Sequence, residues 1–69
     1  MSYKLRFTVP EIEHIKKYAN LTEREERILD LKNSKNPPSI EQIAEIMDMS
    51  VSTVTRTTRD LKNKIIKII

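Results

Sequence analysis

The stretch AEIMDMSVSTVTRTTRDL, residues 44–61, predicts the end of one helix, a brief interruption and a second helix crowded with threonine and arginine. Threonine is a poor helix former, because its branched β-carbon restricts the side chain against the preceding turn. Several of these threonines nevertheless fall on the part of the second helix that would face away from a core. The composition therefore indicates that this exposed face has a task other than stabilising the helix.

Two capping boxes mark where helices begin on the N-terminal side of this stretch. In each, a hydroxyl accepts a hydrogen bond from the amide three residues later, and that later side chain accepts one from the first residue's amide. Thr22 and Glu25 form the first pair, and Ser39 and Gln42 form the second. The first of these helices must end before the prolines of NSKNPP, residues 33–38.

The short helix after Ser39 is expected to end near Met47, where a tight turn must follow. The chain contains no glycine, so the turn requires another residue that tolerates positive φ, and Asp48 is the best candidate. Ser50 can then cap a last helix over about residues 51–66. The apolar stripe expected along that helix consists of Val54, Thr58 or Thr57, Leu61, Ile65 and Ile68.

The first twenty residues predict one further helix. Pro10 suits its first turn, and apolar residues at spacings of three and four continue the pattern to about Ala19. His14 falls off this stripe and is expected at the surface. The preceding YKLRFTV, residues 3–9, alternates like a strand but has no second strand to pair with, so we expect it to be extended or disordered.

The charges are unevenly distributed along the chain. Thirteen Lys and Arg residues against ten Asp and Glu residues give a net charge of +3. The local balance is +2 over residues 1–38, −3 over residues 39–50 and +4 over residues 51–69. A positive last segment favours a polyanionic partner, although a solvated helix face gives the same pattern.

The composition limits the class of protein. A chain of 69 residues with 38% hydrophobic content can bury one small core and predicts a single domain. There is no cysteine and only one histidine, and no apolar run exceeds two residues, far short of the roughly 20 of a membrane span. We expect a cytoplasmic protein with no membrane segment, no catalytic centre, no metal and no cofactor.

A short helix, a turn of about three residues and a long helix form the helix-turn-helix pattern, in which the second helix enters the major groove of DNA. Short hydroxyls can approach base edges and offer a methyl group to thymine, while arginines reach guanine or phosphate. The other interpretation is that these are ordinary solvated polar residues. The outward face expected for the last helix consists of Ser52, Thr55, Arg56, Arg59 and Asn63.

Two segments carry a family resemblance. LTEREERILDL, residues 21–31, followed by IEQIAEIMDMSVSTVTRTTRDLKNKI, residues 40–65, resembles the C-terminal DNA-binding domain of LuxR/GerE-type response regulators. It is also similar to the promoter-reading region 4 of bacterial sigma factors. The resemblance implies that Thr55, Arg56 and Arg59 reach base edges and adjacent phosphates, with Ser52 and Thr53 near the DNA backbone.

The chain departs from this family in three places. Thr55 replaces a common lysine, NSKNPP lacks the usual glycine-bearing link, and the fourth helix through which LuxR-type domains dimerise is missing. An N-terminal helix and an apolar tail, IIKII at residues 65–69, are present instead. Two accounts of this tail stay open: packing against Ile12 and Ile15 within one chain, or a homodimer seam formed with the N-terminal helix.

These observations predict an all-α fold with a three-helix helix-turn-helix core, an additional N-terminal helix and no wing. Residues 1–20 would form the N-terminal arm and extra helix and residues 21–69 the DNA-binding part, within one structural domain. The expected function is a sequence-specific regulator that binds double-stranded DNA without catalysis. The alternative is a sigma-like or adaptor module that binds RNA polymerase or another regulator. The candidate DNA-binding residues are Ser50, Ser52, Thr53, Thr55, Arg56, Arg59 and Lys62.

Overall fold

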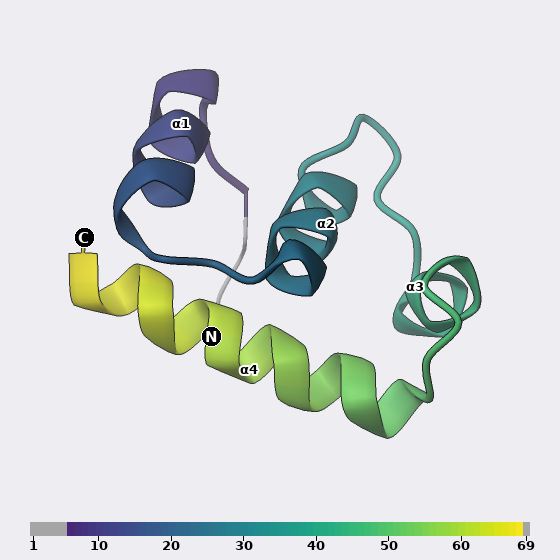
Figure 1. Ribbon diagram of the computed structural model, residues 1–69. Helices are drawn as coiled ribbons and strands as arrows, with labels where there is room; N and C mark the ends of the chain where they lie inside the picture. Colours follow the sequence, from purple (N-terminus) through teal and green to yellow (C-terminus); the bar gives the residue numbers. More distant parts are fainter. Residues whose placement is uncertain (1–5, 69) are drawn as a thin grey trace.

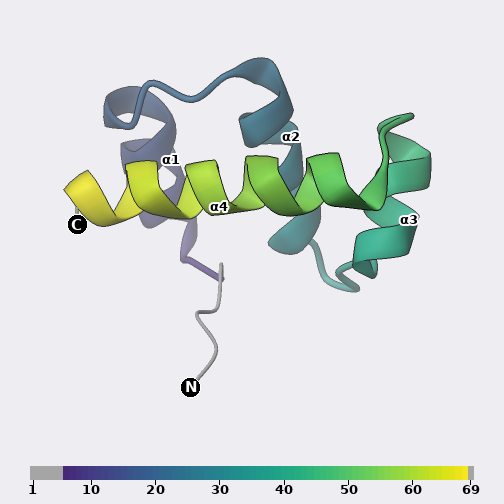
Figure 2. The ribbon, with the colours of Figure 1, turned by 90° about the horizontal axis from the view of Figure 1, so that it is seen from below.

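The computed structural model describes residues 6–68, and within this range the protein is all-helical, with no strand. The four helices are α1 (Val9–Tyr18), α2 (Glu23–Lys32), α3 (Ile40–Ile46) and α4 (Val51–Ile68). Helix α4 runs along one side of the molecule, and the other three are arranged along its length (Figures 1 and 2). α3 lies at its N-terminal end, α2 near its middle and α1 towards its C-terminal end. No helix of the described range is long and apolar enough to cross a membrane.

The helices begin where the polar caps place them. The predicted capping boxes at Thr22 and Ser39 are both present, and each hydroxyl accepts from the amide three residues later. A third box, which was not predicted, starts α1: Thr8 accepts from the amide of Glu11, whose carboxylate accepts from the amide of Thr8. Because these bonds satisfy amides that have no partner within the helix, each start is fixed locally.

The turn between α3 and α4 contains the predicted non-glycine residue with positive φ. Asp48 has φ of 53°. Its amide donates to the carbonyl of Glu45, and the amide of Met49 donates to the carbonyl of Ala44 at 2.8 Å. These are the two hydrogen bonds of a Schellman motif, which closes the end of a helix and sends the chain in a new direction. A second residue with positive φ, Asn20 at 54°, follows α1 and was not predicted.

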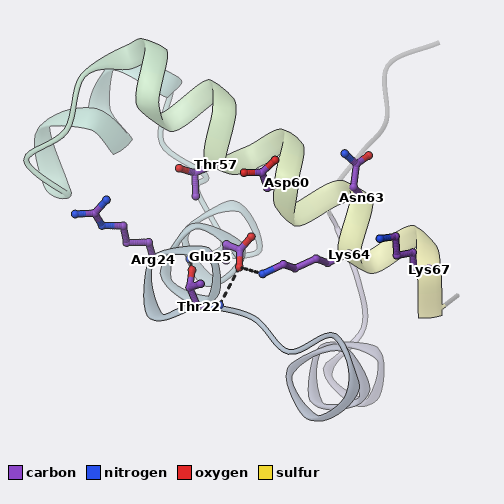
Figure 3. A pocket seen from close by; sticks show the side chains of 8 residues that line it. All are labelled: Thr22, Arg24, Glu25, Thr57, Asp60, Asn63, Lys64 and Lys67. Carbon is purple, nitrogen blue, oxygen red and sulfur yellow. Dashed lines mark hydrogen bonds and ion pairs between the residues drawn. The ribbon is translucent and has the colours of Figure 1, made fainter.

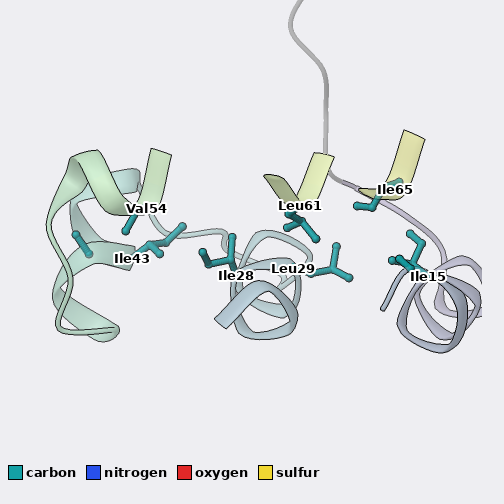
Figure 4. Packing of buried hydrophobic residues seen from close by; sticks show 9 residues of the cluster. Ile15, Ile28, Leu29, Ile43, Val54, Leu61 and Ile65 are labelled. Carbon is teal, nitrogen blue, oxygen red and sulfur yellow. The ribbon is translucent and has the colours of Figure 1, made fainter. Parts of the chain in front are cut away.

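The core is a row of apolar side chains between α4 and the other helices. Figure 4 shows Val54 beside Ile43 of α3, Leu61 above Leu29 of α2, and Ile65 above Ile15 of α1. Each of these side chains is almost completely buried. The whole buried cluster consists of Ile15, Ala19, Ile28, Leu29, Ile43, Ala44, Val54, Leu61 and Ile65.

The apolar tail packs within the molecule. Ile65 is fully buried with Ile15, and Ile12 and Ile68 are partly buried against the same cluster. An ion pair of 2.8 Å between Lys16 and Asp30 further joins α1 to α2. The first account of the tail, packing within one chain, therefore describes Ile65 and Ile68, whereas Ile66 is exposed and Ile69 lies outside the described residues.

The segment before α1 is non-helical where it is described, at residues 6–8. The amide of Phe7 donates a hydrogen bond of 2.7 Å to Oδ1 of Asn33 at the end of α2, and the Phe7 ring packs against the core cluster. Residues 3–5 of the stretch expected to be extended or disordered lie outside the described residues.

Candidate nucleic-acid interface

Helix α4 separates its apolar and polar residues into two faces along 18 residues. Val54, Leu61 and Ile65 recur at spacings of seven and four and are buried. The residues half a turn away point outward: Ser52, Thr55, Arg56, Arg59 and Asn63 are all exposed. We call these five residues the outward face of α4. It is the face that the helical period predicted.

The two threonines at the edge of the apolar stripe are half-buried without leaving a polar atom unpaired. The hydroxyl of Thr57 donates to the carbonyl of Thr53 at 2.8 Å, and that of Thr58 donates to the carbonyl of Val54 at 2.7 Å. Such bonds to the carbonyl four residues earlier let a threonine lie beside a core. The hydroxyls of Thr57 and Thr58 are therefore satisfied within α4 itself.

The two arginines of the outward face are not engaged within the described part of the protein. Ion pairs join Lys16 to Asp30 and Lys64 to Glu25. Within residues 6–68 no carboxylate forms an ion pair with Arg56 or Arg59. Guanidinium groups offer donors in a fixed fork that fits guanine edges and phosphate oxygens. Both arginines are therefore available to an external anion.

The hydroxyls at the start of α4 already have partners. Ser50 Oγ accepts from the amide of Thr53 at 3.1 Å, as the predicted cap requires, and lies 2.8 Å from Oγ1 of Thr53. The hydroxyl of Thr55 donates to the carbonyl of Val51 at 3.0 Å. Because that donor is used, Thr55 would meet a ligand with its oxygen lone pairs and its methyl group. The hydroxyl of Ser52 makes no such bond within residues 6–68.

Lys62 lies beside two other candidate DNA-binding residues, Thr55 and Arg59. It is half-buried on the flank of α4, in a groove of about 500 Å³ that it shares with Lys32, Ile40, Arg59 and Ile66. Thr55, Arg59 and Asn63 of the outward face also line this groove. The sequence placed Lys62 on the correct helix but could not show that its side chain is turned towards α2 and α3.

A second groove lies on the other flank of α4 and is shown in Figure 3. Glu25 is buried there, and its Oε1 accepts from Lys64 Nζ at 2.6 Å and from the amide of Thr22 at 2.8 Å. Burial alone would raise the pKa of this carboxyl, but the bonds from Lys64 and Thr22 outweigh it and hold the pKa below its usual value. This groove is lined by acidic as well as basic side chains. Glu25 and Lys64 at its centre already form an ion pair with each other.

The remaining titratable residues do not converge on a chemical centre. Within residues 6–68, no group of three His, Asp or Glu side chains is placed to hold a metal ion. His14 is exposed as predicted, and its ring centroid lies 4.7 Å from that of Tyr18 on the next turn of α1. The outward face of α4 is therefore the candidate site.

Comparison with known proteins finds no match to this chain among protein-family models, curated proteins or solved structures. The resemblance to LuxR/GerE-type domains accordingly stays a prediction from the motif.

Proposed function

We propose that this protein is a sequence-specific transcriptional regulator that binds double-stranded DNA through the outward face of α4. In this proposal α2, α3 and α4 are the three-helix core of a helix-turn-helix domain, α4 is the recognition helix, and α1 is an additional helix. The observation that supports it most directly is the exposure of Ser52, Thr55, Arg56 and Arg59 on one side of a helix whose other side is anchored in the core.

The chemistry of this face suits the major groove. A B-DNA major groove is about 12 Å wide and admits one α-helix, so short residues allow close approach and long residues must carry the readout. Ser52 and Thr55 are short, and Thr55 presents an acceptor and a methyl group, which suit the amino groups of adenine or cytosine and the methyl of thymine. Arg56 and Arg59 supply the charged donors for guanine or phosphate.

The rest of the fold supports the rigid presentation that such readout needs. Val54 and Leu61 are fully buried, and the Schellman turn at Asp48 fixes how α4 follows α3. The Ser50 cap holds the first turn of α4, which carries Ser52. A recognition helix held in this way loses little conformational entropy on binding.

The test is a fluorescence-anisotropy titration of the protein with a pool of random duplexes at low salt, followed by selection of the bound sequences. We expect binding that weakens steeply with salt, and an enriched motif among the selected duplexes. Binding without any enriched motif would reduce the proposal to a non-specific DNA-binding protein, and absence of binding at low salt would refute it.

The selected motif also tests the homodimer. A two-fold dimer would place two recognition helices about 34 Å apart and select an inverted repeat. Ile65 is already buried against Ile15 within one chain. A dimer interface between α1 and the tail would therefore have to use the more exposed Tyr18, His14 and Ile68. A single half-site in the selected motif argues for a monomeric reader.

A further inference from the structure

The groove that contains Lys62 differs in charge from the other grooves around α2 and α4. It is lined by Lys32, Arg59 and Lys62 and by no acidic residue, whereas the grooves beside Glu25 and beside Asp30 both contain carboxylates. Its apolar lining includes Ile40, which is half-buried, and Ile66, whose side chain is 59% exposed. An occupant of this basic groove should therefore be acidic and should carry an apolar side chain.

A surface with those properties lies on the same protein. Glu41 and Glu45 are one helical turn apart on α3 and both are exposed, so their carboxylates share a face. Ile46 follows directly and is 48% exposed, and Asp48 adds a third carboxylate in the turn. We call Glu41, Glu45, Ile46 and Asp48 the acidic face of α3. Residues 39–50 contain no lysine or arginine to oppose it.

This acidic face cannot fill the groove of its own molecule. Ile43 and Ala44 of α3 are buried against the core, which fixes the orientation of the helix. Ile40, at the start of the same helix, already forms part of the groove wall. Any α3 that enters the groove must therefore come from another copy of the chain.

We propose that the basic groove binds the acidic face of α3 from a second copy of this protein, with Ile46 inserted beside Ile66. The two surfaces are different patches, so the contact is head-to-tail: each copy can give its groove to one neighbour and its acidic face to another. Such a contact continues into short chains of copies and does not close as a two-fold dimer.

The contact should be weak and sensitive to salt. A seven-residue helix buries less surface than the roughly 1,200–2,000 Å² of stable interfaces, and exposed ion pairs contribute little each. The inference does not depend on DNA binding, and its test contains no DNA. Thr55, Arg59 and Asn63 belong to both sites, so the groove variants below change other residues and leave the outward face of α4 intact.

The experiment uses sedimentation velocity over about 10 µM to 1 mM protein at low salt. The groove variant is Lys32→Glu with Ile66→Asp, and the acidic-face variant is Glu41→Lys with Glu45→Lys. We expect the average mass of the wild type to rise continuously past that of a dimer. Each variant alone should associate at least about tenfold more weakly, because like charges then meet across the contact.

The decisive arm mixes the two variants in equal amounts. The groove variant keeps a normal acidic face, and the acidic-face variant keeps a normal groove, so one productive contact remains. The mixture should form a one-to-one dimer and nothing larger. A strictly monomeric wild type, a wild type that stops at a dimer, or a mixture that stays monomeric while the wild type associates would each overturn the proposal. If the acidic-face variant fails to fold by circular dichroism, Ile46→Ser replaces it, and if the groove variant fails to fold, Ile66→Asp alone replaces it.

Discussion

Lys64 Nζ lies 2.6 Å from Oε1 of Glu25, although 39 residues separate the two in the sequence. The contact joins the first turn of α2 to the C-terminal half of α4 (Figure 3). The same carboxylate oxygen completes the capping box by accepting from the amide of Thr22. Glu25 therefore serves two levels of structure at once: it starts a helix and it holds that helix against α4.

Removing the cation should cost more than an ordinary surface substitution. Lys64→Met keeps the length of the side chain but leaves the buried carboxylate of Glu25 without its charged partner. We expect unfolding free energy to fall by about 1–3 kcal/mol, less than for a fully buried pair because Lys64 is one-third exposed. Urea denaturation followed by circular dichroism measures this. The control is Lys67→Met, one turn away and exposed, which should change stability by no more than about 0.5 kcal/mol.

The pH dependence of the free energy of unfolding should reveal the titration of the Glu25 carboxyl. Its pKa is lower in the folded protein than in the unfolded chain, so the unfolded chain takes up the proton first as pH falls. The stabilisation is thus fully present above the ordinary glutamate pKa of about 4.3 and is lost as pH drops through the lower folded value. Glu25→Gln can keep the capping box but cannot titrate. Between neutral and acid pH the wild type should lose more stability than this variant, and equal losses would show that the pair contributes nothing to acid sensitivity.

Local features of this fold were predictable because they depend on residues a few positions apart. The boxes at Thr22 and Ser39, the cap at Ser50 and the positive φ at Asp48 all follow from short patterns. The box at Thr8 follows the same pattern and could have been found, since Glu11 stands three residues later. Pro10 indicates that a helix starts there, but proline at the first turn does not by itself identify the capping residue.

Features that depend on packing could not be predicted in this way. The helical period identified the outward face of α4, but the direction of Lys62 is set by where α2 and α3 lie beside that helix. The pairing of Glu25 with Lys64 likewise needs the two helices to be docked. Because α4 contacts every other helix, the grooves along its flanks are lined partly by side chains that are distant in the sequence.

The turn at Asp48 predicts a gain of stability. A non-glycine residue at φ of 53° is strained by its β-carbon. Asp48→Gly removes that strain but makes the unfolded chain more flexible, so we expect a net stabilisation of about 0.5–1 kcal/mol. Asp48→Ala keeps a β-carbon and loses the carboxylate, and it should destabilise the protein. Thermal unfolding of the wild type and the two variants ranks their stabilities. If glycine proves no better than alanine, the turn is not strained at this residue.

Two adjacent isoleucines test how α4 is seated on α1. Ile65 is fully buried beside Ile15 (Figure 4). Its neighbour Ile66 is 59% exposed. Ile65→Ala should lower unfolding free energy by about 2–4 kcal/mol through lost burial and a residual cavity. In dilute solution Ile66→Ala should cost less than about 0.5 kcal/mol. Similar costs for the two substitutions would mean that α4 is rotated about its axis from the orientation described.

The proposed DNA contacts predict different outcomes for the two exposed arginines according to what each touches. If Arg56 or Arg59 reads a base, its replacement by alanine should weaken binding by about 1–3 kcal/mol and relax the preference at one base pair of the selected motif. If it touches phosphate, affinity should fall equally for all sequences, and the slope of log affinity against log salt should become shallower by about one. Anisotropy titrations at several salt concentrations, with matched and mutated duplexes, separate these cases. Arg27→Ala is the control, because Arg27 is an exposed arginine of α2 outside the proposed site. If all three variants bind alike, the outward face of α4 is not the DNA-binding surface.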